Sequence, residues 1–226
     1  KGMNIYHSSQ IFDELNAPFC TFFTVLCSNW RDYGKKYRSF SVGKWYECRE
    51  YHPLFPGKGS ARVALVLTNR QNAFVLERAK GLGVPCVWFA KSDWESGELV
   101  LSTLREHDID FVVLAGFLAR VPDNILHAYP NKMINIHPSL LPKFGGKGMY
   151  GDRVHQAVVE AGEKESGITI HRVNGQYDSG DIIAQHRVPL APDDTPQEVA
   201  AKVHALEYEY YPQAVEAELA LSLIHI

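Results

Sequence analysis

The pattern that most constrains this fold is an alternation of apolar, strand-like runs with segments of helical spacing, beginning near residue 60. Ile109–Ala115 has the sequence IDFVVLA, and an almost continuous apolar run of this length is typical of a strand that is covered on both faces. Strands that alternate with helices favour a mainly parallel sheet. The sequence therefore predicts an α/β fold with a mainly parallel sheet flanked by helices.

The expected elements follow one another in a regular order. Apolar, β-branched runs predict strands, and apolar residues at helical spacing predict helices. The expected strands are 61–67, 84–90, 109–115, 133–137, 167–173 and 181–188. The expected helices are 73–82, 94–106, 122–128, 153–162 and 195–221, the last of which starts at a Thr-Pro pair.

Length and composition suit one substantial domain and argue against two classes of partner. The chain has 226 residues, 46% of them hydrophobic, and a net charge of -3, which allows one sizeable core. A basic stripe with interleaved aromatic residues is missing from the sequence, so we expect no nucleic-acid partner. The apolar runs are too short for a membrane-spanning helix, so we expect no membrane partner.

The four cysteines carry little information about a metal or redox site. None of them forms a C-x-x-C pair with another, and that spacing is the usual signature of zinc or redox chemistry. Free cysteines are typical of a reducing compartment. We therefore expect a cytoplasmic protein without a bound metal.

A polar pair interrupts the strand expected at 133–137, which has the sequence MINIH and is followed directly by Pro138. Side chains two positions apart project from the same face of a strand, so Asn135 and His137 point together. Ligands of parallel α/β sheets bind beyond the carboxyl ends of the strands, where this pair lies. An amide N–H can stabilise an oxyanion, and an imidazole can exchange a proton near neutral pH. The pair therefore predicts attack on a carbonyl group.

A candidate carboxylate follows the strand expected at 167–173. The connection to the next strand is polar and rich in glycine, and it contains Asp178. A carboxylate close to an imidazole favours the protonated imidazole and fixes its orientation. Asp178 is therefore a candidate partner for His137.

Two stretches carry a family resemblance: INIHPSLLPKF at 134–144 and HRVNGQYDSGDII at 171–183. Together they resemble the phosphoribosylglycinamide formyltransferases, folate-dependent enzymes of purine synthesis, and DFVVLAGFLARVP at 110–122 and ALEYEYYP at 205–212 support the match. The resemblance covers residues 60–218. It implies the formyltransferase fold, which is a Rossmann-like sheet flanked by helices, with the N-terminal strand disrupted in this chain.

The resemblance also implies a reaction and its site residues. The family moves a formyl group from 10-formyltetrahydrofolate to the amine of glycinamide ribonucleotide. Asn135, His137 and Asp178 match its catalytic residues; Asn135 and protonated His137 would hold the tetrahedral oxyanion, and Asp178 would raise the pKa of His137. Glu207 matches the acidic residue that binds the ribose hydroxyls. The positions that match the folate site are Leu118, Ala119, Arg120, Val121, Asn174, Gly175, Gln176 and Tyr177.

The partners implied by the resemblance are the two small-molecule substrates, glycinamide ribonucleotide and formyl folate. It implies no metal, and a protein that is either a monomer or a homodimer.

This sequence departs from the family pattern in two places. The loop at 144–151 is longer and richer in glycine than the family's, and it is either a mobile lid that brings Lys147 near a phosphate or a variant without a special role. The family also opens with a strand and a G-S-G-[ST]-N loop that binds the nucleotide phosphate at a helix start. That loop is missing from the sequence.

The segment Lys35–Phe55 suggests a reason for the missing loop. Read one nucleotide later, permitted codons for this segment spell KNIAVLASGSGTNAENIIRYF, which contains the absent strand, loop and helix. We therefore interpret 1–56 as an aberrant, frame-shifted segment, 57–220 as the catalytic domain and 221–226 as a non-native tail. A chain with this literal sequence is expected to lack a central strand and to bind the nucleotide weakly, and the codons of 35–55 test the interpretation.

The sequence is also compatible with other functions. A formyltetrahydrofolate hydrolase shares the Asn-x-His strand and the aspartate but sends the formyl group to water, and its usual N-terminal regulatory domain is not visible here. A methionyl-tRNA formyltransferase normally carries a C-terminal tRNA-binding domain. An inactive folate-binding remnant is the alternative from another class.

Overall fold

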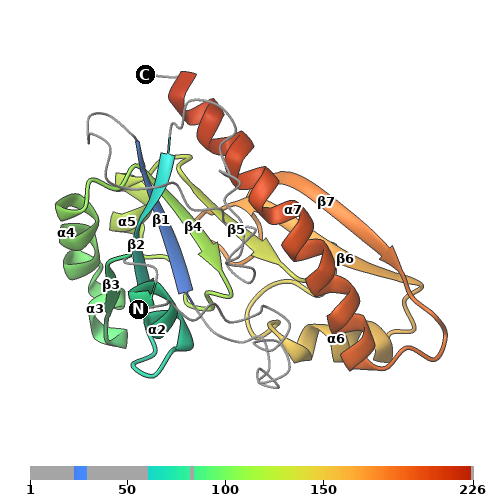
Figure 1. Cartoon of the computed structure of the whole chain (residues 1–226). Coiled ribbons are helices and arrows are strands. Elements are labelled where there is room, and N and C mark those ends of the chain that lie inside the picture. The colour runs from blue at the N-terminus through green and yellow to red at the C-terminus, as the bar shows by residue number, and fades with distance from the viewer. Residues whose placement is uncertain (1–22, 30–60, 82–83, 225–226) are drawn as a thin grey trace, which may run out of the picture.

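The computed structural model describes residues 23–29, 61–81 and 84–224, and a seven-stranded sheet forms its centre (Figure 1). The strands are β1 (Phe23–Asn29), β2 (Ala61–Thr68), β3 (Cys86–Trp88), β4 (Phe111–Ala115), β5 (Met133–His137), β6 (Glu165–Arg172) and β7 (Ile182–Pro189). The helices are α2 (Phe74–Gly81), α3 (Lys91–Ser96), α4 (Glu98–Glu106), α5 (Asp123–Ala128), α6 (Asp152–Glu160) and α7 (Pro196–Ile224). Across the sheet the strands lie in the order β3-β2-β1-β4-β5-β6-β7.

Most strands of this sheet run in one direction. The pairs β2–β3 and β4–β5 are parallel, and β2 and β4 share a direction because each is antiparallel to β1. Strand β6 is antiparallel to β5, and β7 is antiparallel to β6. Five strands therefore point the same way, and β1 and β6 oppose them. The prediction of a mainly parallel α/β sheet is confirmed.

The expectation that this chain lacks a central strand is wrong, because β1 lies inside the sheet between β2 and β4. It pairs with β2 along 24–29 and with β4 along 23–27, and both pairings are antiparallel. Strand β1 thus lies inside the segment 1–56 that was interpreted as aberrant, and ahead of the stretch 35–55 whose codons test the interpretation. Residues 35–55 lie outside the described part of the chain, so the interpretation of that segment stays a prediction.

Helices cover both faces of the sheet, as Figure 1 shows. On one face α2, α6 and α7 pack against alternate residues of the central strands, among them Val66, Val113 and Ile134. On the other face α3, α4 and α5 pack against the intervening residues, such as Leu65 and Val112. This alternation is the period of two that a strand imposes. The apolar run at 111–114 is buried because it faces helices on both sides.

Two of the differences between the expected and the observed elements are informative. The helix predicted at 94–106 is two helices, because Gly97 takes a φ of 70° between α3 and α4, a conformation that favours glycine. Helix α7 continues through Ile224, so the first residues of the segment interpreted as a tail extend this helix. Among the described helices, none is long and apolar enough to cross a membrane.

Candidate active site

The candidate site lies at the carboxyl end of β5, beside the antiparallel strand β6. Strand β5 spans Met133–His137, as predicted, and Asn135 and His137 lie on the same face. Across the strands Asn135 faces His171 and His137 faces Thr169. The segment that follows β4 lies at the same edge, because β4 and β5 are parallel.

Both ring nitrogens of His137 face protein groups. Its Nε2 lies 2.8 Å from the carbonyl oxygen of Phe144, and its Nδ1 lies 3.5 Å from Oδ2 of Asp178. A carbonyl oxygen only accepts hydrogen bonds, so Nε2 carries a proton and donates it. The neutral ring is therefore the tautomer with hydrogen on Nε2, and a second proton would sit on Nδ1, against the aspartate.

Burial decides the protonation of His137. The ring is 4% exposed, and this loss of solvent lowers its pKa below the usual 6.5. The Asp178 carboxylate and the Phe144 carbonyl raise the pKa, but they do not offset the burial. Asp178 acts in the predicted direction, but burial outweighs it, so the pKa of His137 is lowered and not raised.

Asp178 is held in place by the glycine-rich loop. The Gly146 N–H donates to Oδ2 of Asp178 at 2.9 Å, so the same oxygen faces both this loop and His137. The backbone of Asp178 has a φ of 50° and that of Phe144 a φ of 55°, values that are uncommon outside glycine and that occur often at functional sites. The 144–151 loop is therefore tied to the candidate catalytic carboxylate.

His171 is a member of this cluster that was not predicted as a site residue. Its Nε2 lies 3.2 Å from Nδ2 of Asn135 and 3.7 Å from Oδ1 of Asp178. Position 171 follows position 169 on the same face of β6, and a strand-period comparison with Asn135-x-His137 could have pointed to it. Its pairing with Asn135 depends on the strand register, which is not visible in the sequence.

The two segments expected to form the folate site meet at Arg120. The Arg120 guanidinium donates through Nε to the Gly175 carbonyl at 2.8 Å, and the Arg120 N–H donates to the Tyr177 hydroxyl at 3.1 Å. On the other side, the indole N–H of Trp94 donates to the Arg120 carbonyl at 2.8 Å. The stretch 118–121 is thus fixed from α3, and the loop 174–178 closes over it.

Comparison with known proteins places this site in a family. A model described as Formyl transferase matches residues 50–215. The chain belongs to the formyl transferase family. A relative named phosphoribosylglycinamide formyltransferase, from Bacillus subtilis, is 36% identical over 166 residues, which cover 72% of this chain and 83% of that protein.

A plant relative and a solved structure give the same family name. The chloroplastic phosphoribosylglycinamide formyltransferase of Arabidopsis thaliana is 40% identical over 189 residues, which cover 81% of this chain. The match spans 65% of the length of that plant protein. The crystal structure of phosphoribosylglycinamide formyltransferase from Streptococcus pneumoniae is similar with a TM-score of 0.63 at 38% identity, over 73% of this chain and 87% of that one. The chain thus has the formyltransferase fold.

Glu207, the expected nucleotide contact of this formyl transferase family member, lies on α7. Its side chain is partly exposed, yet the loss of solvent around the carboxyl raises its pKa to about 8. Within the described residues it forms no ion pair. A carboxyl group in such surroundings suits a ligand that donates hydrogen bonds, such as a diol.

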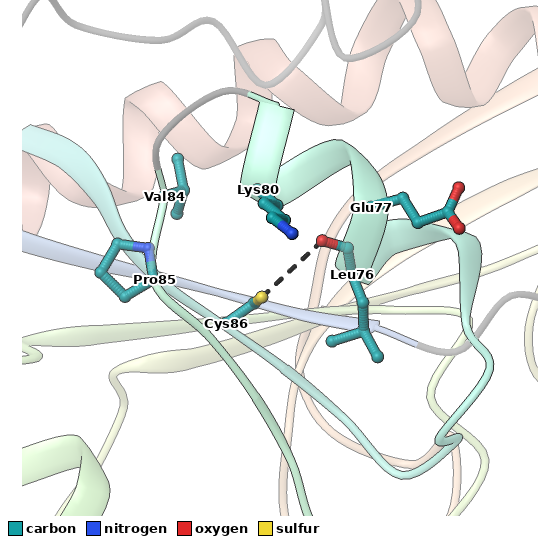
Figure 2. A pocket seen from close by; sticks show the side chains of 6 residues that line it. All are labelled: Leu76, Glu77, Lys80, Val84, Pro85 and Cys86. Atoms are coloured by element: carbon teal, nitrogen blue, oxygen red, sulfur yellow. Dashed lines mark hydrogen bonds between the residues drawn. The ribbon is translucent and has the colours of Figure 1, made fainter.

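A cavity elsewhere on this family member does not belong to the candidate site. It has a volume of about 610 Å³ and lies between α2 and the edge strand β3, lined by Leu76, Glu77, Lys80, Val84, Pro85 and Cys86 (Figure 2). The Cys86 thiol donates to the Leu76 carbonyl. In the part of the chain that the structure describes, no group of three or more His, Cys, Asp or Glu side chains is placed to hold a metal ion.

Proposed function

We propose that this chain transfers a formyl group from 10-formyltetrahydrofolate to the amine of glycinamide ribonucleotide. The observation that carries the proposal is the convergence of Asn135, His137 and Asp178 at the carboxyl edge of the sheet in a formyl transferase. The names of the relatives support formyl transfer to glycinamide ribonucleotide, and the folate donor follows from the family resemblance.

The proposed reaction runs through a tetrahedral intermediate. The amine nitrogen attacks the formyl carbon, a C–N bond forms, and the carbonyl electron pair moves to oxygen. The oxyanion then collapses, the bond from carbon to the folate nitrogen breaks, and that nitrogen takes up a proton while the attacking amine loses one. The balance needs no other reactant, only donors for the oxyanion and a route for one proton.

The chain's own residues supply both requirements. Asn135 can donate an amide N–H to the oxyanion, and neutral His137 can donate from Nε2 once the substrate replaces the Phe144 carbonyl. Donors of this kind contribute about 3 kcal/mol each to the transition state. Asp178, 3.5 Å from Nδ1, stabilises the imidazolium that forms when His137 takes the proton in transit.

Substrate binding is proposed for the segments beside this trio. Leu118, Ala119, Arg120 and Val121 would form one wall of the folate site, with Asn174, Gly175, Gln176 and Tyr177 as its cover. The bonds from Arg120 to Gly175 and Tyr177 support a shared site. Glu207 would bind the ribose hydroxyls. No metal takes part, and we further propose a cytoplasmic monomer or homodimer.

Incubation of the purified chain with both substrates tests the proposal. Transfer yields formylglycinamide ribonucleotide, whereas a hydrolase yields formate, and a folate-binding remnant yields neither. We expect transfer, because relatives at 36–40% identity bear the name of the transferase. Formate as the main product would instead identify a formyltetrahydrofolate hydrolase.

His137→Ala should reduce kcat by about 10²–10⁴-fold, the usual contribution of a proton-transferring group. Folate binding, followed by tryptophan fluorescence, should persist, since the folate segments do not depend on this ring. The matched control is His186→Ala, because His186 stacks on Tyr210 at 3.7 Å and forms no part of the trio. Unchanged turnover in His137→Ala would remove His137 from the mechanism.

A further inference from the structure

We propose that His171 is a positioning residue that fixes the orientation of the Asn135 carboxamide. The inference rests on the proposed formyl transfer at Asn135. His171 is 3% exposed and lies directly across from Asn135 in the β5–β6 pairing. It reaches no oxyanion itself and acts through the amide.

The hydrogen bonds of His171 define its tautomer. Nδ1 lies 2.8 Å from the Arg172 carbonyl oxygen, which only accepts, so Nδ1 carries the proton. In the neutral ring, Nε2 is then an acceptor; Oδ1 of Asp178 lies 3.7 Å from Nε2, which is too far for a hydrogen bond. The Asn135 group 3.2 Å away must therefore present its N–H to Nε2, as it does through Nδ2.

This contact excludes the flipped amide. Rotation of the Asn135 side chain by half a turn would place Oδ1, an acceptor, against the acceptor Nε2, and two lone pairs would face each other. The other end of the amide does not set the orientation, because Oδ1 of Asn135 is buried and has no hydrogen-bond partner among the described residues. Within the described residues, the ring of His171 is the group that decides which way the amide points.

The orientation matters for the proposed reaction. With one N–H engaged by His171, the second N–H of the Asn135 amide has a fixed direction and is available for the oxyanion. The unpartnered Oδ1 is a buried acceptor, and burying such a group without a partner is costly. Its natural complement is an N–H, such as that of the attacking amine. In this fixed orientation, the Asn135 amide offers a donor to the oxyanion and an acceptor to the attacking amine.

The position of His171 is itself constrained by its surroundings. Gly180 lies so close to this strand that a Cβ there would collide with the Arg172 carbonyl oxygen and lie 3.6 Å from Nδ1 of His171. The loop after Asp178 therefore covers the ring. Because the Arg172 carbonyl is held by the β6 backbone, the tautomer of His171 follows from the fold.

A pair of amide substitutions separates positioning from packing. In His171→Gln the far end of the new side chain can occupy the place of Nε2 and accept from Asn135, whereas His171→Asn reaches only the place of Nδ1. We expect His171→Asn to lower kcat at least about tenfold with an unchanged KM for folate, and His171→Gln to restore much of that loss.

A double substitution supplies the decisive comparison. If His171 acts through Asn135, His171→Asn should cause no further loss of kcat when Asn135 is already alanine. A loss of the same size in both backgrounds would overturn the proposal, as would full activity of His171→Asn or equal losses in the Asn and Gln variants.

An NMR measurement that does not depend on catalysis tests the role of His171 separately from the proposed function. In the NMR spectrum, the amide protons of Asn135 Nδ2 should show one hydrogen-bonded, slowly exchanging proton in the original chain and in His171→Gln. That signal should be lost in His171→Asn. Absence of product from the original chain would contradict the proposed function, whereas an Asn135 amide that is insensitive to residue 171 would contradict the inference.

Discussion

At the scale of single residues, two neighbouring effects shift the pKa of the His137 imidazole in opposite directions. Burial lowers the pKa of His137, while the Asp178 carboxylate at 3.5 Å raises it. A ring that is neutral at rest but has a carboxylate beside Nδ1 can take a proton when one is released nearby, and then return it. The aspartate therefore matters most for the transient imidazolium.

Asp178→Asn should lower the pKa of His137 further, because the raising influence of the carboxylate is lost while the burial stays. The proton would be harder to accept, and kcat should fall by at least about tenfold. An NMR titration of the His137 ring in both proteins measures the shift. A pKa that rises on substitution would contradict this electrostatic account. Asp181→Asn, in the exposed residue at the end of the same loop, is the matched control.

At the scale of elements, α6 and α7 meet at a pair of histidines. His155 of α6 is 2% exposed and its ring packs edge-on against that of His204 of α7, with centroids 5.9 Å apart. Burial and the neighbouring His204 lower the pKa of His155 to about 4, although Asp152 opposes the shift. Burial also lowers the pKa of His204. This contact lies directly after the glycine-rich loop and makes the packing of α6 sensitive to acid.

The free energy of unfolding should fall as the pH is lowered from about 6.5 to about 4. In that window the unfolded chain binds a proton at His155 and the folded chain does not, so protons favour unfolding; above pH 6.5 the residue makes no pH-dependent contribution. The loss is at most about 3 kcal/mol, at about 1.4 kcal/mol for each unit of pKa. Urea unfolding across this range measures it.

His155→Gln should flatten this part of the pH dependence, because glutamine does not titrate. His127→Gln, in an exposed residue of α5, is the control and should leave the slope unchanged. An equally steep slope in the His155 variant would assign the acid sensitivity to other groups.

At the scale of the whole molecule, helix α7 connects distant parts of the sheet. The Tyr211 hydroxyl donates to the Leu114 carbonyl of β4 at 2.6 Å. Farther along the helix, Glu218 forms a 2.6 Å ion pair with Arg172 of β6, and the same guanidinium donates to the Asn131 carbonyl before β5. These contacts fix α7 against the strands that carry the site.

Arg172→Met should lower the free energy of unfolding by about 3–5 kcal/mol, because it leaves the buried carboxylate of Glu218 without a partner. Glu218 has a side-chain exposure of only 7%. The matched control is Arg187→Met, which breaks the exposed pair with Glu165 between β7 and β6 and should cost no more than about 1 kcal/mol. Equal losses in urea unfolding would show that burial does not distinguish the two pairs.

The order of elements from β2 to α7 was predictable from the sequence, since it depends on short-range patterns. Periods of two and of 3.6 residues are local, and the strand at 133–137 and its polar pair follow from them. The turn at Gly97 was missed because glycine at that spacing is compatible with either a continued or a broken helix. The division into 1–56, 57–220 and 221–226 stays a prediction, as does the role of each site residue.

The shared face of Asn135 and His137 follows from the local sequence, because alternation along a strand is a property of the backbone. The contact between His171 and Asn135, 36 positions apart, cannot be read from the sequence, since antiparallel register depends on the packing of the whole sheet. The lowered pKa of His137 also depends on the tertiary structure. A pKa depends on how much solvent the folded chain removes, and that loss outweighs the charge of Asp178. The central place of β1 is likewise a consequence of long-range pairing.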